Sequence, residues 1–248
     1  MKRFTFILEN EKKKKLYPRD LAPKLQGVLM QNLPSEVAES LHQREINPYS
    51  TWVSRIDEEY KWEINVIDDK LAQRIETIFF DNDFKEIVLR SYGDLVMNIK
   101  EKKKEVHNIE KLSRNFYEKE APSKFSISFL SPTSFKSQGE YVFFPDIRLL
   151  IQSAMRKYQA LNENDKEVDE HLLQELESRA RVTSYRTKSQ YFKVHQSSIP
   201  AFEGEVTISV NGNQTLKNYI FMLFSFAEYS GVGIKSSMGM GKIKLVSK

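Results

Sequence analysis

The segment 231–242, close to the end of the 248-residue chain, gathers residue types that suit phosphate binding. It contains four of the nine glycines, two serines and two lysines. Glycine lacks a β-carbon, so its backbone can approach a phosphate closely, and successive backbone N–H groups can surround an anion. The lysine side chains add positive charge. The predicted phosphate contacts are Gly231, Gly233, Lys235, Ser236, Ser237, Gly239, Gly241 and Lys242.

Two other interpretations of this segment have to be weighed. A nucleotide-binding P-loop requires Gly-Lys followed by Ser or Thr at the start of a helix. Here Gly241-Lys242 is followed by Ile243, and only six residues remain after Lys242, which leaves scarcely any room for a phosphate-holding helix. The P-loop is therefore disfavoured. A plain glycine-rich connection between a helix and an edge strand stays open as the alternative.

A second basic segment, 178–202, contains five arginines and lysines and no acidic residue. Its cations are interleaved with Tyr185, Tyr191 and Phe192. This pattern suits phosphate contacts combined with stacking on the unpaired bases of a nucleic acid. The predicted contacts are Arg181, Arg186, Lys188 and Lys193. The alternative is a β-hairpin with its aromatic residues in the core and its arginines in water.

Four histidines, His42, His107, His171 and His195, are candidates for proton transfer, because the imidazole group titrates near neutral pH. Taken alone, each also fits an ordinary surface or structural role. The chain has no cysteine, which excludes thiolate metal sites, and no compact Asp/Glu/His cluster with metal-ligand spacing. We therefore expect neither a metal site nor a cofactor.

The composition is that of a folded protein. Hydrophobic residues make up 40% of the chain, enough to bury a core, and the net charge of +4 says little about partners unless its distribution is considered. No apolar run approaches membrane-spanning length, and the apolar run near the N-terminus is too short for a signal peptide. We expect a cytoplasmic protein with no membrane association.

The predicted strands and helices that must position these residues occur in the same order in both halves of the chain. In the first half, Phe4, Phe6 and Leu8 alternate with other residues and predict an opening strand. The further elements are a helix after Pro18, a short helix from Ser35, strands at 51–56 and 61–67, a helix over 69–80 and a strand at 87–89. This βαββαβ order is typical of a ferredoxin-like module. The charged stretch 100–105 that follows is interpreted as a solvated linker.

The second half repeats the pattern less regularly. Its elements are a strand at 124–129, a helix opened by Pro145-Asp146, an acidic helical stretch to about 177, two strand-like runs within 178–210, a helix capped by Asn213 and a strand at 242–246. The prediction is an α+β protein of two tandem ferredoxin-like (RRM-like) modules, with antiparallel sheets and helices on one face. The modules span 1–110, with His42, and 111–248, with the glycine-rich segment.

Four stretches together resemble a known family: GVGIKSSMGMGKI at the C-terminus, RFTFILE at the N-terminus, LQGVLMQNLPSEVAESLHQ and FPDIRLL. The chain is similar to the CRISPR repeat-processing endoribonucleases of the Cas-six family, within the RAMP superfamily. The resemblance covers the whole chain, and the C-terminal glycine-rich stretch is its most diagnostic part.

The resemblance implies that the chain binds CRISPR repeat RNA and cuts it without a metal, leaving a 2′,3′-cyclic phosphate and a 5′-hydroxyl. It singles out His42 as the catalytic histidine, because the family commonly has one after the first helix of the first module. Tyr49 is a candidate partner of His42. The alternative is a catalytically silent RAMP-type RNA-binding subunit. Association with other Cas proteins and pairing of two chains stay open.

Overall fold

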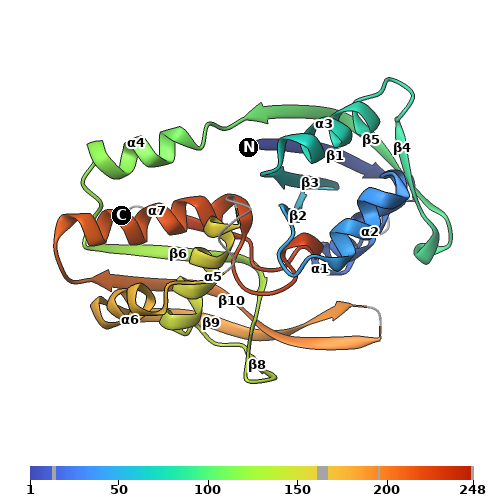
Figure 1. The fold of residues 1–248 in the computed structure, drawn as a ribbon. Coiled ribbons are helices and arrows are strands. Elements are labelled where there is room, and N and C mark those ends of the chain that lie inside the picture. The colour runs from blue at the N-terminus through green and yellow to red at the C-terminus, as the bar shows by residue number, and fades with distance from the viewer. Residues whose placement is uncertain (13–14, 161–166, 195, 247–248) are drawn as a thin grey trace. The chain divides into compact units, whose positions relative to one another are not determined.

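The structure, a computed structural model, describes residues 1–12, 15–160, 167–194 and 196–246 (Figure 1). The chain divides into two compact units. The first contains Met1–His107 and Ser237–Gly239, and the second contains Asn108–Ser236 and Met240–Lys248. The change of unit after His107 lies close to the predicted boundary at residue 110. The glycine-rich segment, however, does not stay within one unit, because Ser237–Gly239 belongs with the first.

The first unit is built on an antiparallel sheet with the strand order β2-β3-β1-β5-β4. Its elements are β1 (Lys2–Asn10), α1 (Pro18–Asn32), α2 (Ser35–Gln43), β2 (Tyr49–Ile56), β3 (Glu59–Val66), α3 (Asp69–Phe79), β4 (Glu86–Leu89), a 3-10 turn η1 (Arg90–Tyr92) and β5 (Leu95–Val106). The order β2-β3-β1-β5 is that of a ferredoxin-like sheet, and β4 adds a further strand at the edge.

One face of this sheet carries the core of the first unit. Phe4, Phe6 and Leu8 are fully buried, so the predicted alternation along β1 is confirmed. The helices α1 and α3 bury Leu25 and Ile75 in the same hydrophobic cluster. Both helices therefore cover the same face of the sheet, as a ferredoxin-like arrangement requires.

The interpretation of 100–105 as a linker is wrong, because these residues lie within β5, which pairs with β1 along nearly the whole length of that strand. The charged side chains of β5 form ion pairs at its surface, including Lys100 with Glu9 at 2.5 Å and Lys104 with Glu76 at 2.5 Å. The second half of β5, from residue 100 on, has no apolar pattern and is stabilised here by its hydrogen-bonded neighbour. Hydropathy periodicity does not detect such a stretch of strand.

The second unit has a four-stranded antiparallel sheet in the order β11-β6-β10-β9 and a separate two-stranded hairpin, β7-β8. Its elements are α4 (Glu110–Glu118), β6 (Lys124–Thr133), β7 (Phe135–Ser137), β8 (Glu140–Val142), α5 (Ile147–Gln159), α6 (Glu170–Arg179), β9 (Ala180–Val194), β10 (Ser197–Val210), α7 (Gln214–Ser230), a 3-10 turn η2 (Ser236–Met238) and β11 (Ile243–Val246). This order is again ferredoxin-like, which confirms the predicted α+β class.

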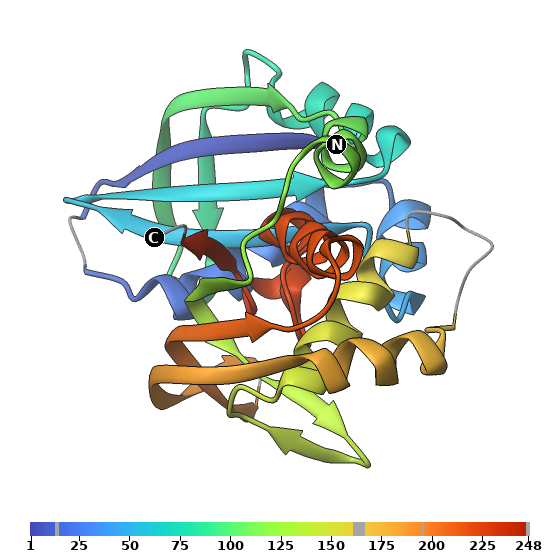
Figure 2. The same cartoon turned by 90° about the vertical axis from the view of Figure 1, so that its left-hand side faces the viewer.

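Helices α5 and α7 lie on the same face of this sheet (Figure 2). Leu150 from α5 and Phe224 from α7 are fully buried in one cluster with Ile127 from β6. The predicted cap at Asn213 is present, because its side chain accepts a hydrogen bond from the Leu216 N–H at 3.0 Å. The helix predicted to open at Pro145-Asp146 is capped in the same way, by the side chain of Asp146, which accepts from the Leu149 N–H at 2.8 Å. In the ranges that the structure describes, none of the helices is long and apolar enough to cross a membrane.

Helix α5 also holds the beginning of the glycine-rich segment. The Ser153 hydroxyl accepts a hydrogen bond from the Gly233 N–H at 2.7 Å. One helical turn later, the Lys157 ammonium donates to the Ser230 carbonyl at 3.2 Å and to the Ser236 hydroxyl at 2.9 Å. Lys157 is only 8% exposed, and its burial lowers its pKa to about 7. An almost fully buried lysine thus joins the end of α7 to the segment that follows it.

This burial predicts a specific pH dependence of stability. Lys157 has a pKa of about 7 in the folded chain, against an ordinary value of 10.5. Between these values the unfolded chain binds more protons than the folded chain, so this residue's contribution to stability rises with pH. The substitution Lys157→Met removes the titrating group. We compare the free energy of unfolding of the wild type with that of Lys157→Met, measured by urea unfolding. As the pH rises from roughly 7.5 to 9.5, the wild type should gain up to about 1.4 kcal/mol per pH unit relative to the variant.

Lys124→Met is the matched control, because Lys124 is an exposed lysine of the same unit. Its stability difference from the wild type should not change with pH over this range. A Lys157→Met difference that also stays constant would show that Lys157 keeps an ordinary pKa.

Candidate nucleic-acid interface

His42 lies in the last turn of the short helix α2 and is exposed. Its neighbour Leu41 is buried in the core of the first unit and is only 5% exposed. The Pro34 carbonyl accepts hydrogen bonds from the N–H groups of Val37 and Ala38, which fixes the start of the helix. The burial of Leu41 therefore holds α2 in place while the imidazole of His42 stays accessible to a substrate.

The other histidines are placed differently. His171 is exposed on α6, and His195 lies outside the described residues. His107 is partly buried, and its backbone N–H donates to the Met1 carbonyl at 2.9 Å. Among the described residues, no group of three or more His, Cys, Asp or Glu side chains is arranged to hold a metal ion.

Tyr49 does not have the environment of a catalytic side chain. It is 2% exposed, and its hydroxyl accepts a hydrogen bond from the Gln26 amide at 3.3 Å and contacts the Met30 sulfur at 3.9 Å. Burial raises its pKa, while hydrogen bonds from Gln26 and Ser237 oppose that rise. The prediction that Tyr49 assists His42 is not supported by this burial, because the hydroxyl does not face solvent. Tyr49 instead joins α1 to the glycine-rich segment.

The residues Ser237–Gly239 pack against the first unit. The Thr51 hydroxyl donates to the Ser237 carbonyl at 3.2 Å. Gly239 has φ +101°, and a β-carbon at this position would lie 2.4 Å from the β-carbon of Ala22 on α1. A side chain at Gly239 would therefore collide with α1. This glycine is explained by close packing, whether or not it also contacts RNA.

The structure also explains why the remaining positions of the segment are occupied by glycine. Gly233 and Gly241 both have φ +71°, and β-carbons there would lie 2.3 Å from the Ser134 carbonyl oxygen and 1.8 Å from that of Val232. Gly231, likewise at φ +71°, closes α7. Only glycine fits such positions without displacing the backbone.

Most backbone N–H groups of the segment are already hydrogen-bonded inside the protein. The N–H groups of Val232, Gly233, Ile234, Met240, Gly241 and Lys242 donate to oxygen atoms of the chain at 2.7–3.3 Å. They are not available to phosphate in this structure. An anion site made by this segment therefore does not extend over all the predicted glycines.

The two lysines of the segment have opposite environments. Lys235 is exposed at the tip, with φ +55°. Lys242 is buried, 8% exposed, and its ammonium donates to the Glu228 carbonyl at 2.7 Å. Ser236 receives the hydrogen bond from Lys157. The geometry supports a phosphate contact for Lys235 and does not support one for Lys242.

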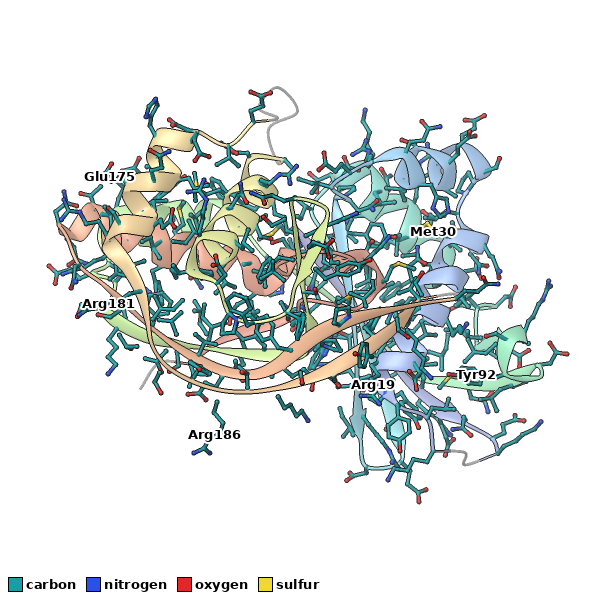
Figure 3. The ribbon with its side chains drawn as sticks, turned by 90° about the horizontal axis from the view of Figure 1, so that it is seen from below. Arg19, Met30, Tyr92, Glu175, Arg181 and Arg186 are labelled. Atoms are coloured by element: carbon teal, nitrogen blue, oxygen red, sulfur yellow. The ribbon has the colours of Figure 1, made fainter. Side chains whose placement is uncertain are left out.

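Strand β9 carries the second predicted basic surface and forms one edge of the second sheet. All four of its predicted contacts are exposed: Arg181, Arg186, Lys188 and Lys193. In Figure 3 the Arg186 side chain projects away from the strand. The Lys188 Nζ lies 3.7 Å from the Glu203 Oε2 on β10. An ion pair at the protein surface contributes little to stability.

The aromatic residues of β9 divide into two kinds. Tyr185 and Tyr191 are 68% and 64% exposed, whereas Phe192 is fully buried. Both interpretations of this segment are therefore partly right, since it is a hairpin strand with one aromatic side chain buried and two rings left in solvent. The two tyrosines remain available for stacking on bases.

Residues 127–243 match the family described as CRISPR-associated endoribonuclease Cas6. A protein of that name from Streptococcus thermophilus is 41% identical over 229 residues, which cover 92% of this chain and 92% of the relative. Another, from Mycobacterium tuberculosis, is 36% identical over 226 residues, covering 91% of this chain and 71% of the relative.

The fold is shared with solved structures. A Cas6 product complex superposes with a TM-score of 0.79 at 20% identity and covers 100% of both chains. A Thermus thermophilus Cas6 superposes with a TM-score of 0.72 at 22% identity, covering 99% of this chain and 98% of the other. On its sequence identity to relatives over nine-tenths of its length, the chain belongs to the CRISPR-associated endoribonuclease family Cas6.

Proposed function

We propose that this chain is an endoribonuclease that binds and cleaves CRISPR repeat RNA into guide units. The observation that carries the proposal is the 41% identity, over 92% of the chain, to a relative named as an endoribonuclease. The similarity extends over both units, and His42 is exposed on α2. The alternative of a catalytically silent RNA-binding subunit is not favoured, because the relatives that match about nine-tenths of this chain carry the name of the enzyme.

The proposed reaction is an internal transfer within the RNA. The ribose 2′-oxygen loses its proton and forms a bond to the adjacent phosphorus, while the bond from phosphorus to the 5′-oxygen of the next nucleotide breaks. That oxygen gains a proton. The products are a 2′,3′-cyclic phosphate and a 5′-hydroxyl. Since the RNA supplies its own nucleophile, the step requires no metal-bound water.

His42 is the proposed proton-transfer group, because imidazole can act as base toward the 2′-OH or as acid toward the leaving 5′-oxygen. Its exposed position leaves room for a phosphodiester beside it. The RNA backbone is the proposed ligand of the exposed cations Arg181, Arg186, Lys188, Lys193 and Lys235. Location in the cytoplasm, pairing of two chains and association with other Cas proteins remain predictions from the sequence.

The first test concerns His42. General acid or base catalysis contributes roughly 100-fold to 10,000-fold, so His42→Ala should lower the single-turnover cleavage rate of repeat RNA by that order while RNA affinity stays near the wild-type value. Gln43→Ala, a change at the next exposed residue of the same helix, is the control and should leave the rate unchanged.

The same assay examines the nucleophile. Repeat RNA with a 2′-deoxy nucleotide just upstream of the cut should bind but resist cleavage, and EDTA should not slow cleavage of the normal RNA. Near-normal cleavage by His42→Ala, or cleavage of the deoxy RNA at the same place, would contradict this mechanism.

The second test concerns the basic surface of β9. Replacing Arg186 and Lys188 by alanine removes two exposed cations, so the slope of log Kd against log salt should fall by roughly 0.7 for each phosphate that the protein no longer binds. Affinity should fall most at low salt. The double change Lys70→Ala and Lys85→Ala removes two exposed lysines of the first unit and serves as the control. Equal slopes for both double variants would show that β9 does not contact the RNA backbone.

A further inference from the structure

A groove in the second unit lies beside the exposed part of β9 and is not explained by phosphate contacts. It encloses about 630 Å³ and is lined by Phe144, Pro145, Val182, Thr183, Ser184, Tyr185 and Thr187. This volume is within the range of about 300–1,000 Å³ that small-ligand pockets occupy. The lining contains two aromatic rings, three serine and threonine residues and no charged residue.

The two rings come from separate elements and are both exposed. Phe144 is 59% exposed and Tyr185 is 68% exposed. Phe144 stands just before α5, where its carbonyl accepts a hydrogen bond from the Asp146 N–H at 2.9 Å. Its backbone is thus fixed while its ring stays in solvent. A large apolar ring held in this way, beside a second ring, is typical of a surface that stacks on a planar partner.

An irregularity of β9 shapes the other wall. The register with β10 shifts between Thr207 and Ile208, so that Thr183 has no partner of its own in the ladder. The Thr183 hydroxyl instead donates to the Thr207 carbonyl at 3.3 Å. Such a bulge twists a strand and redirects the side chains that follow it. Three of the residues that follow it, Ser184, Tyr185 and Thr187, line the groove.

The chemistry of the lining favours an unpaired nucleotide. Successive side chains of a strand point to opposite faces, so Arg186 and Lys188 do not share the face of Tyr185 and Thr187 and lie outside the groove. Glu205 and Glu203 of β10 stand opposite these two cations in the ladder. Rings for the base and hydroxyls for the sugar match two parts of an unpaired nucleotide.

We propose that this groove binds one unpaired nucleotide of the RNA, with its base stacked on Phe144 and Tyr185. The proposal rests on the function proposed above and adds to it a base-binding subsite in the second unit. Stacking of this kind tolerates any base, because each base has an aromatic face. The subsite therefore favours an unpaired position in the RNA and not a particular sequence.

The test is a cycle that combines protein variants with abasic RNA. Repeat RNAs with a single abasic nucleotide at successive positions are bound to the wild type, Phe144→Ala and Tyr185→Ala, with the scissile position 2′-deoxy so that no cleavage intervenes. At one position, removal of the base should weaken wild-type binding by roughly 5-fold to 100-fold. The same removal should have little further effect in either variant, because the stacking partner is already absent.

Three controls make the result specific. Tyr185→Phe keeps the ring and should preserve the abasic effect. Tyr117→Ala removes an 82% exposed tyrosine on α4 and should also preserve it. Thermal unfolding should show that both groove variants fold, as expected for changes at exposed side chains.

The outcomes separate this proposal from the proposed function. If the wild type neither binds nor cleaves repeat RNA, the proposed function fails. If the wild type does both but no abasic position couples to Phe144 or Tyr185, the nucleotide subsite is overturned, and the groove belongs to another class of partner.

Discussion

The close packing of the C-terminal glycine-rich segment is the constraint on which the candidate interface depends. Gly233 and Gly241 bring the segment against carbonyl oxygens at distances that leave no space for a β-carbon, and Gly239 does the same against α1. These contacts hold the segment at both ends and leave the tip with Lys235 exposed. The positions of the exposed groups are therefore set by backbone contacts and not by flexible side chains.

Buried polar groups complete this arrangement. Lys157 joins the end of α7 to Ser236, and Tyr49 joins α1 and Ser237, so each buried side chain secures one part of the same segment. Both residues are of types often found in active sites, yet both are enclosed. Groups that are rigidly held can present their neighbours to a ligand without a further loss of conformational freedom. In this chain the enclosed polar residues hold the segment in place, and the exposed ones are those proposed to contact RNA.

Much of the fold could be predicted from the sequence because its core strands and helices have clear apolar periods. Phe4, Phe6 and Leu8 identify β1, and Asp146 and Asn213 mark the starts of helices. The charged part of strand β5, 100–105, could not be found in this way, since these residues are ordered by pairing with β1, a contact between distant parts of the chain. The identification of His42 came from resemblance to a family, and its exposure on α2 is compatible with it.

The candidate interface was less predictable than the fold. Composition showed that glycines and lysines gather at the C-terminus, but not that Lys242 is buried and Lys235 exposed. That difference depends on tertiary packing around Glu228, whose carbonyl binds Lys242. Lys157 and Ser153 did leave a signal, because they are polar residues four apart beside an apolar helical stripe. Phe144 begins the FPDIRLL stretch that contributes to the family resemblance, but its residue type and spacing did not mark it as a binding residue.

The place of β9 at the edge of its sheet has a consequence for solubility. An edge strand of 15 residues presents backbone groups to which another chain could add as a further strand, which is a route to aggregation. Charged side chains and bulges are the usual protection of such edges, and β9 has both, in its exposed cations and in the irregularity at Thr183. The positive charge along β9 therefore keeps copies of the chain apart as well as attracting a polyanion. Replacing these cations by uncharged residues would remove part of this protection and favour edge-to-edge association of two chains. This limits which substitutions β9 can accept.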